Sequence, residues 1–384
     1  MARDLFEWEH EQFRAAFKQF IEREILPHYD RWEQEGIVDR GLWQAAGHGG
    51  FIAMAVPPEY GGPGITDFRF NVIVTEEIAR AGVAPVAFPL LNDVTLAYFL
   101  GLTDEDQKRR WLPGITKGEL ITAIAMTEPS TGSDVAGIRT TARRDGDHYI
   151  VSGSKTFITN GQNADLVIVA AKTDPDAGSK GVSLLVLERD MPGFKRGRNL
   201  QKIGQHAQDT SELFFDEVRV PLANRLGAEG SGFYSLMHNL AQERLSIAVT
   251  SVAVTETVLE QTIHYVRERR AFGQPIGAFQ NTRFLIAELH TETTIARVFV
   301  DQCIKSHLVK ELAPETAAMA KWWTSELLVR VIDRCLQLHG GYGYMLEYPI
   351  ARAYVDWRPQ TIYGGSTEIM KEIIGRSLRL DKTV

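Results

Sequence analysis

The C-terminal part of the chain keeps a helical spacing of apolar residues over a long distance, with almost no proline or glycine to interrupt it. The spacing that starts at Phe233 predicts a helix reaching about Arg270, which the segment 272–275 ends. A second helix is expected over residues 280–312, and a third starts at Pro314, a residue suited to a first helical turn. Long helices stacked side by side form bundles, so the sequence predicts a four-helix bundle over residues 227–384.

Residues 120–226 follow a different pattern. They contain short runs rich in Val, Ile, Thr and Phe, separated by turn pairs such as Asp145-Gly146 and Asn160-Gly161. This pattern predicts a middle β-domain of short antiparallel strands. The expected strands are 121–126, 140–144, 149–152, 166–171, 182–187 and 213–215.

Residues 1–119 read as helical again. Asp4 followed by Glu7 predicts the N-terminal cap of the first helix, and further helices are expected over 71–81 and 92–100. A chain of 384 residues exceeds the usual size of a single core. We therefore predict an α+β fold with a helical N-terminal domain (1–119), a β-domain (120–226) and a C-terminal bundle (227–384).

Composition excludes several functional classes. The formal net charge of −7 argues against a nucleic-acid surface, and no apolar run is long enough to span a bilayer. Cys303 and Cys335 lie in apolar helical stretches and are expected to be buried, reduced thiols. The acidic N-terminus resembles neither a signal nor a transit peptide, so we expect a cytoplasmic protein. The ten histidines show no metal-ligand spacing, and no metal site is predicted.

Two glycine-containing segments are suited to binding a ligand. In residues 125–137 the hydroxyls of Thr127 and Ser133 and a glycine turn could bind the polar edge of a heteroaromatic ring, although a plain polar turn between strands is the favoured explanation of the segment taken alone. Gly340 and Gly341 let a backbone approach a ligand closely, with a simple helix C-cap as the alternative.

Taken in order, residues 125–137, 337–356 and 361–370 resemble the signatures of the acyl-CoA dehydrogenase family. The resemblance extends over residues 9–381 and is greatest to the long-chain type, whose base position is shared with the isovaleryl type. It implies FAD bound without a Rossmann fold, an acyl-CoA substrate, a homotetramer, and an electron-transfer flavoprotein as electron acceptor.

The resemblance also implies which residues contact FAD. Arg269, Phe272 and Gln280 match positions that reach the FAD of a neighbouring subunit. Phe157 stands where a tryptophan is usual, which keeps an aromatic face but loses the indole donor. For Glu368, a helix-start acid that counters the helix dipole is an equal alternative. The full implied set is Thr127, Ser133, Phe157, Ile158, Thr159, Arg269, Phe272, Gln280, Gln337, Gly340, Gly341, Ser366 and Glu368.

The position after Tyr363 is the most informative one. Many family members carry there the carboxylate that removes a proton from the substrate, whereas this chain has Gly364. The long-chain and isovaleryl types carry the base on another helix, at the position of Glu243. The resemblance thus implies Glu243 as the base and the backbone N–H of Gly364 as a donor to the thioester oxygen. Arg244, Tyr363 and also Ser133 are expected on the substrate side. A surface carboxylate paired with an arginine is the alternative for Glu243.

The implied reaction is α,β-dehydrogenation of an acyl-CoA to a trans-2-enoyl-CoA, with loss of an α-proton to the base and of a β-hydride to flavin N5. Medium to long straight chains are favoured, with branched or terpenoid chains as the alternative. Leu96, Tyr98, Phe99, Leu236 and Leu240 are candidates for the wall of the acyl pocket. A flavin oxidase or monooxygenase on the same fold, and a non-catalytic acyl-CoA-binding homologue, remain as other readings.

Overall fold

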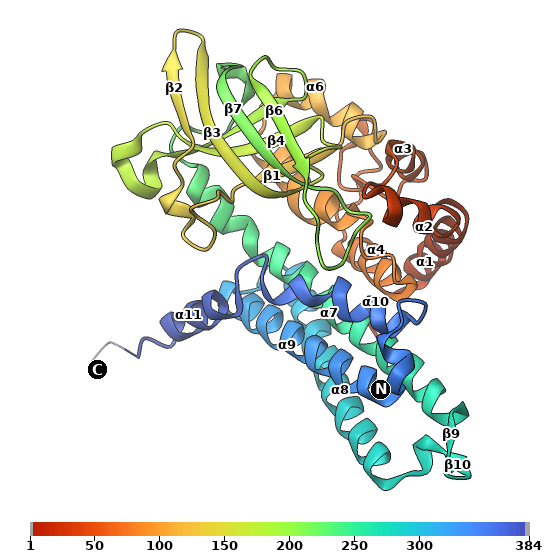
Figure 1. Cartoon of the computed structure of the whole chain (residues 1–384). Coiled ribbons are helices and arrows are strands. Elements are labelled where there is room, and N and C mark those ends of the chain that lie inside the picture. The colour runs from red at the N-terminus through yellow and green to blue at the C-terminus, as the bar shows by residue number, and fades with distance from the viewer. Residues whose placement is uncertain (1–2, 381–384) are drawn as a thin grey trace.

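The computed structural model describes residues 3–380, and its first part is helical. These helices lie beside the sheet in the upper half of Figure 1. Their core is rich in aromatic side chains, among them Phe17, Trp32 and Trp111. The helices are α1 (Trp8–Phe20), α2 (Leu26–Glu35), α3 (Arg40–His48), α4 (Phe68–Ala81), α5 (Leu96–Leu102) and α6 (Glu105–Thr116).

The start of α1 differs from the prediction. Glu7 is the N-cap residue, and its partner in the capping box is His10. Asp4 accepts a hydrogen bond from Lys305 Nζ at 2.8 Å instead. The predicted cap at Asp4 is therefore wrong, because that carboxylate pairs with a lysine that the sequence places 301 residues away.

The middle part is an eight-stranded sheet in the order β6-β7-β3-β2-β4-β5-β8, with β1 beside β4. Most neighbours are antiparallel, as predicted, but β1 runs parallel to β4, and β2 meets β4 in parallel at Thr141 and Lys172. The strands are β1 (Thr122–Ala125), β2 (Thr141–Asp145), β3 (His148–Thr159), β4 (Leu166–Lys172), β5 (Val182–Glu188), β6 (Phe194–Asn199), β7 (Thr210–Pro221) and β8 (Arg225–Leu226).

Strands β4 and β5 are buried on both faces of the sheet. Ile168 and Leu184 belong to the core of the N-terminal helices, whereas their neighbours Val167 and Leu185 belong to a separate core within the β-domain. Successive side chains point to opposite faces, so these continuous apolar runs are what a sheet covered on both sides requires. The N-terminal helices and the sheet thus share one core.

The C-terminal part is built on three long helices, with two short ones packed against α9. Helix α7 also contacts α4 and β5, so it touches all three parts of the molecule. Figure 1 shows it running from the sheet to the small hairpin at the far end of the bundle. The elements are α7 (Gly232–Glu268), β9 (Arg270–Ala271), β10 (Gln274–Pro275), α8 (Gln280–Leu308), α9 (Pro314–His339), α10 (Pro349–Asp356) and α11 (Thr367–Ser377). The predicted three-part fold is confirmed, and its domain boundaries remain our proposal.

The two cysteines are buried in the bundle and unpaired, as predicted. Burial raises the pKa of each thiol to about 11, which keeps both protonated. They therefore act as small apolar side chains in the core.

A buried carboxylate joins the N-terminal helices to the bundle. Glu76 of α4 is fully buried and lies within 3.4 Å of the guanidinium groups of four arginines. Arg3, Arg14 and Arg80 belong to the N-terminal part, and Arg297 belongs to α8. The arginine charges satisfy a group that could not otherwise be ionised in the core.

Candidate functional site

Glu243 lies on α7 where that helix passes the N-terminal helices, and its side chain is buried. The hydroxyl of Tyr98 donates a hydrogen bond to Glu243 Oε1 at 3.0 Å. Burial raises the pKa of Glu243 to about 7, opposed by the Tyr98 hydrogen bond and by the charge of Arg244. A carboxylate that titrates near neutral pH is suited to general base catalysis. The alternative of a surface carboxylate paired with an arginine does not fit a buried side chain whose partner is a tyrosine.

The loop at Gly364 packs directly against α7. Gly364 and Gly365 both adopt left-handed backbone conformations, with φ of +64° and +96°. A Cβ atom at Gly364 would lie 2.4 Å from Cδ1 of Ile247. Ile247 follows Glu243 by one helical turn, so both side chains lie on the same face of α7. The structure thus brings Glu243 close to Gly364, the position at which the resemblance leads one to expect an acid.

Two buried cations hold the carbonyl groups of this loop. Arg244 Nε donates to the Gly364 carbonyl at 3.4 Å, and Lys321 Nζ of α9 donates to the Gly365 carbonyl at 2.6 Å. Burial lowers the pKa of Lys321 to about 8. Lys321 was missed in the sequence, although a lysine following Ala317, Ala318 and Ala320 in a buried stretch was an available signal. The contact of Arg244 is with the Gly364 backbone.

The loop that carries Thr127 and Ser133 is fixed to β3 by a buried ion pair. Lys155 Nζ donates to the Met126 carbonyl at 2.9 Å and to Glu128 Oε1 at 2.8 Å. The Glu128 carboxylate also accepts backbone N–H groups from the far end of the loop, at residues 139 and 140. Its role here is structural. Ser133 is exposed at the tip of the anchored loop, and Thr127 is half-buried at its base.

Phe157 stands out from β3 at an irregular point in its pairing with β7. Its φ is +59° and its side chain is 68% exposed, whereas Ile158 is buried in the β-domain core. Thr159 is half-buried at the end of the strand. An aromatic face held outward by a strained backbone is suited to stacking on a flat ring.

Four of the predicted cofactor residues line one cavity at the far end of the bundle. The cavity has a volume of about 510 Å³ and is lined by Arg269, Gln337, Gly340 and Gly341, together with Tyr265, Ile276, Leu338, His339, Tyr342 and Met345. Gly340 has a φ of +58°, and no protein atom lies within 4 Å of a Cβ at Gly341. A guanidinium group next to open glycine backbone is suited to a diphosphate. These residues therefore fit the FAD that the resemblance implies.

Phe272 and Gln280 lie outside this cavity, in and after the hairpin that joins α7 to α8. Phe272 is 95% exposed, and its ring meets that of Phe279 edge-on. Gln280, at the start of α8, is also exposed.

The cavity is far from Glu243. Arg269 follows Glu243 by 26 residues along α7, which at 1.5 Å per residue corresponds to about 39 Å. This distance exceeds the length of an FAD molecule. One FAD could therefore lie against both Glu243 and Arg269 only if these two residues came from different chains.

Near the loop, Ser366 is the N-cap residue of α11 and Glu368 lies in the first turn of that helix. The pKa of Glu368 is lowered mainly by a hydrogen bond from Ser366. Glu368 is thus placed to counter the dipole of α11, the role that the sequence offered as the alternative to contact with FAD. Tyr363, expected on the substrate side, is partly exposed beside Gly364.

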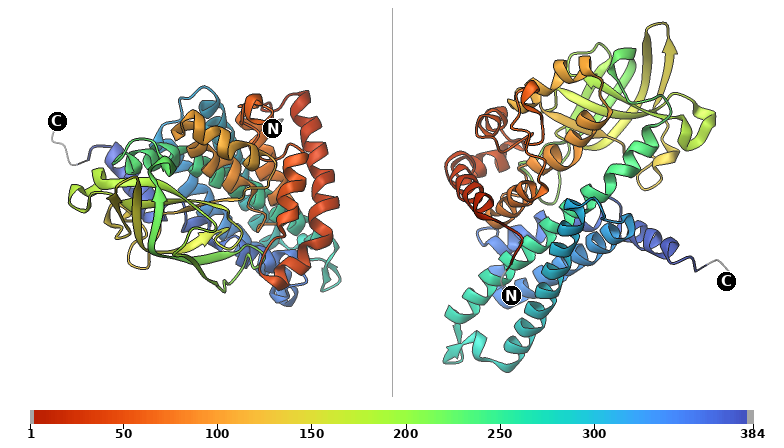
Figure 2. Two further views of the ribbon diagram at one scale, coloured as in Figure 1. Left: turned by 90° about the horizontal axis from the view of Figure 1, so that it is seen from above. Right: turned by 180° about the vertical axis from the view of Figure 1, so that it is seen from behind.

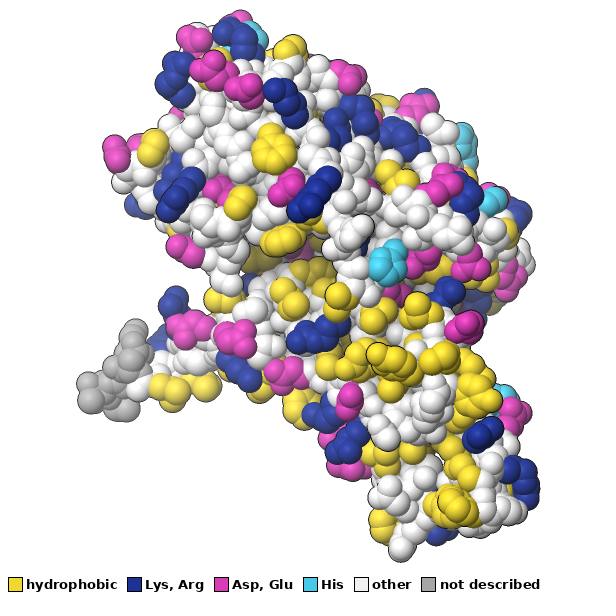
Figure 3. Space-filling view, in the orientation of Figure 1, with side chains coloured by type: hydrophobic (Ala, Val, Ile, Leu, Met, Phe, Trp, Pro, Cys, Tyr) yellow, Lys and Arg dark blue, Asp and Glu magenta, His cyan; other side chains and the backbone are white. Residues whose placement is uncertain are grey.

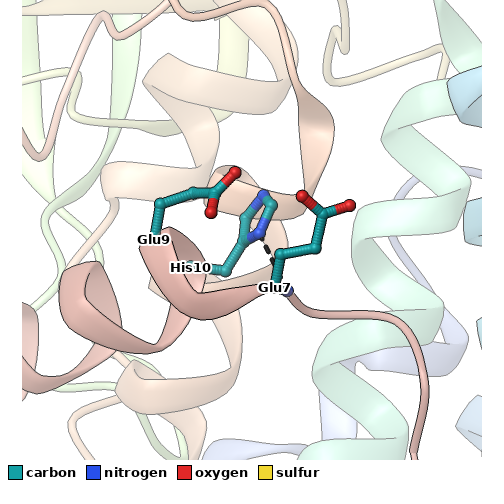
Figure 4. Close-up of side chains that lie close together, drawn as sticks. All are labelled: Glu7, Glu9 and His10. Atoms are coloured by element: carbon teal, nitrogen blue, oxygen red, sulfur yellow. Dashed lines mark hydrogen bonds between the residues drawn. The ribbon is translucent and has the colours of Figure 1, made fainter.

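Glu7, Glu9 and His10 form a small cluster at the start of α1 (Figure 4). His10 Nδ1 accepts the backbone N–H of Glu7 at 3.1 Å, and Nε2 lies 3.2 Å from a carboxylate oxygen of Asp67. Both ring nitrogens are therefore engaged in protein contacts, and the capping box of α1 accounts for the contact between Glu7 and His10.

Along residues 3–380, no helix combines the length and the apolar character needed to cross a bilayer.

Comparison with known proteins covers nearly the whole chain. Three family profiles match in order: "Acyl-CoA dehydrogenase, N-terminal domain" at residues 7–119, the middle domain at 123–218 and the C-terminal domain at 230–379. The chain is 46% identical to the mitochondrial long-chain specific acyl-CoA dehydrogenase of Sus scrofa, over 99% of this chain and 89% of that protein.

Two solved structures extend the comparison. An acyl-CoA dehydrogenase from Geobacillus kaustophilus is 49% identical, with a TM-score of 0.97 over 99% of this chain and 100% of that one. A glutaryl-CoA dehydrogenase from Mycobacterium smegmatis, solved in complex with FADH2, is 27% identical, with a TM-score of 0.89 over 99% of this chain and 96% of that one. The chain therefore belongs to the acyl-CoA dehydrogenase family, a family of flavoprotein oxidoreductases that act on CH–CH bonds.

Proposed function

We propose that this protein is an FAD-dependent acyl-CoA dehydrogenase in which Glu243 is the base. The observation that carries this proposal is the buried Glu243 carboxylate, with a pKa raised to about 7, on the face of α7 that meets Gly364. Glu243 takes the α-proton of the acyl thioester, and the electrons of that C–H bond form the new double bond as the β-hydride leaves. Bound FAD supplies the hydride acceptor.

Other residues of the chain would bind the cofactor and stabilise the charge that develops on the thioester. Phe157 and the anchored loop with Thr127 and Ser133 would hold the flavin ring, and the cavity beside Arg269 would hold the diphosphate of an FAD in a partner subunit. Arg244 and Lys321 fix the loop at Gly364, whose backbone N–H would stabilise negative charge on the thioester oxygen. A rigid donor placed before the charge develops needs no rearrangement during the reaction.

Anaerobic mixing with an acyl-CoA tests the function. We expect the flavin absorbance to bleach without oxygen, and an electron-transfer flavoprotein to restore it. Rapid oxygen consumption with the same substrate would instead identify an oxidase or monooxygenase. Absence of bleaching with every acyl-CoA, in protein that binds FAD, would identify a non-catalytic homologue.

The likeness to the long-chain type supports medium to long straight acyl chains as substrates. Each methylene buried in the pocket should favour binding by about 0.8 kcal/mol until the pocket ends. Across a series from butyryl-CoA to stearoyl-CoA, kcat/KM should therefore rise and then level off or fall at a definite length. A maximum at butyryl-CoA or isovaleryl-CoA would overturn the long-chain assignment and favour branched chains, without affecting the role of Glu243.

We further propose that the protein is a homotetramer in which FAD bridges two subunits. The separation of about 39 Å between Glu243 and Arg269 supports this, since one FAD cannot reach both within a chain. Figure 3 shows hydrophobic side chains gathered on the surface of the bundle, in keeping with exposed residues such as Tyr342, Tyr344 and Leu346. Exposed apolar surface of this kind is typical of an interface between subunits.

Replacing Arg269 with alanine should weaken FAD binding by about 10- to 100-fold, because a charged hydrogen-bond donor to phosphate is lost. Equilibrium dialysis of FAD against the two proteins would measure the change. Arg267→Ala is the matched control, since Arg267 is an exposed arginine in the last turn of the same helix. A stable monomer with full flavin content, seen by native mass spectrometry, would contradict the bridging arrangement.

A further inference from the structure

Glu243 has a specific hydrogen-bond partner that the sequence does not indicate. Tyr98 of α5 is fully buried, and its hydroxyl donates to Glu243 Oε1 at 3.0 Å across 145 residues of sequence. The two side chains come from the N-terminal helices and the bundle, so the contact crosses the boundary between two parts of the fold. Within residues 3–380, Tyr98 is the one side chain that donates a hydrogen bond to this carboxylate.

The charged groups around Glu243 have other partners. Arg244, its neighbour on α7, donates to the Gly364 carbonyl, and Lys321 of α9 donates to the Gly365 carbonyl. On the side of α5, the buried carboxylate of Asp93 accepts hydrogen bonds from Asn71 and Ser246. Glu368 of α11 lies on the surface.

A buried carboxylate without a donor is stabilised in its protonated form, and a protonated acid cannot take a proton from the substrate. A hydrogen bond to the ionised form offsets part of this effect. A neutral hydroxyl lowers the pKa of the carboxyl moderately. An arginine in direct contact would lower this pKa by about 1–3 pH units and weaken the carboxylate as a base. The hydroxyl contacts Oε1, and within residues 3–380 no side-chain hydrogen bond engages Oε2.

We propose that Tyr98 is a positioning residue for Glu243, holding the carboxylate in one orientation and stabilising its ionised form for proton abstraction. This inference rests on the proposed role of Glu243 as the base. Tyr98, named from the sequence only as a candidate for the pocket wall, then sets the pH range in which the enzyme works.

The test is Tyr98→Phe, which removes the hydroxyl and keeps the ring. Infrared titration follows the carboxylic-acid band of Glu243, assigned by its loss in Glu243→Gln. The titration midpoint of that band should rise by about one pH unit in Tyr98→Phe. The acidic limb of anaerobic flavin reduction should move by the same amount, so that the rate falls about fivefold at pH 7, approaches a loss of about tenfold at lower pH, and recovers at alkaline pH.

A matched control removes a tyrosine hydroxyl from another tyrosine–glutamate pair. Tyr149 of β3 donates to Glu229 outside the site, and Tyr149→Phe should leave the Glu243 midpoint unchanged. Because Tyr98→Phe can disturb the core, a second variant keeps the side chain intact. Placing 3-fluorotyrosine at position 98 makes the hydroxyl a stronger donor, and the midpoint should then fall.

The outcomes separate this inference from the proposed function. A Glu243 midpoint that moves in neither variant overturns the role of Tyr98, even in an active enzyme. Loss of activity at every pH with an unchanged midpoint also overturns it, because that result describes a purely structural residue. Shifted midpoints in a protein that reduces no flavin would support the Tyr98 contact and contradict the proposed reaction.

Discussion

Glu243→Gln should retain FAD and lower the rate of anaerobic flavin reduction by acyl-CoA by about 10⁴-fold. Glutamine keeps the shape of the side chain and can still accept the Tyr98 hydrogen bond, but it cannot accept a proton. A loss of this size is at the upper end of the rate contribution of a general base. We expect it because Gly364 has no carboxylate that could replace that of Glu243. Stopped-flow absorbance measures the rate, and a denatured sample gives the flavin content.

The control is Glu260→Gln, on the exposed side of the same helix. It removes one carboxylate from α7 without touching the site, so the rate should stay at the level of the unmodified protein. If Glu243→Gln keeps more than a few per cent of the original rate, the base lies elsewhere and the proposed mechanism fails.

Glu76→Gln should lower the free energy of unfolding by about 3–5 kcal/mol, the largest stability effect we expect from a single change. The substitution leaves four arginine side chains around a buried neutral group. Two of these arginines, Arg14 and Arg297, are themselves largely buried. Calorimetric melting compares the variant with the unmodified protein. Glu372→Gln is the control, because its exposed pair with Arg376 should contribute at most about 1 kcal/mol.

The contribution of Glu76 depends on pH in a defined direction. Burial alone would raise its pKa, but the charges of Arg297, Arg3, Arg80 and Arg14 outweigh burial and lower the pKa to about 2, from 4.5 for a free carboxyl. The folded state therefore binds this proton less readily than the unfolded chain. The stabilisation is fully present above pH 4.5 and is lost as the pH falls toward 2. The difference in melting temperature between Glu76→Gln and the unmodified protein should shrink over that range; a constant difference would contradict the ionised state of Glu76.

The sequence was sufficient to predict the elements whose apolar residues recur with a strong periodicity. The long helix over 233–270 was placed to within two residues at each end, because an apolar stripe without breakers specifies a helix. Strand β6 was missed, since its sequence of Phe, Lys, Arg, Gly, Arg and Asn has no apolar alternation and is held by pairing with β7. This segment forms a strand because it pairs with β7, and no local sequence pattern encodes that pairing.

The functional site likewise contains some residues whose roles the sequence could indicate and others whose roles it could not. Gly364 and Glu243 could be related from the sequence because one motif lacked an expected acid and another carried it. The Tyr98 hydroxyl and Lys321 ammonium could not be assigned roles, because each acts on an atom far away in the chain: a carboxylate 145 residues distant and a carbonyl 44 residues distant. The first contact depends on how the N-terminal helices dock on the bundle, and the second on how α9 packs against the loop at Gly364 and Gly365.

The continuity of α7 limits how the molecule can open. Large hinge movements are absorbed by a few residues in loops or at the ends of elements. Sharp kinks in helices arise at proline, at Gly/Ser pairs, at π-bulges, or where a side chain or water enters the backbone hydrogen bonds. Helix α7 runs for 37 residues through all three parts with no proline and with its one glycine at the first position. Helix α7 therefore offers no sharp bending point of its own between the sheet and the far end of the bundle. Any opening of the molecule would have to take place in the loops that lead into this helix, such as residues 227–231, while the helix keeps Glu243 and the cavity beside Arg269 at a fixed separation.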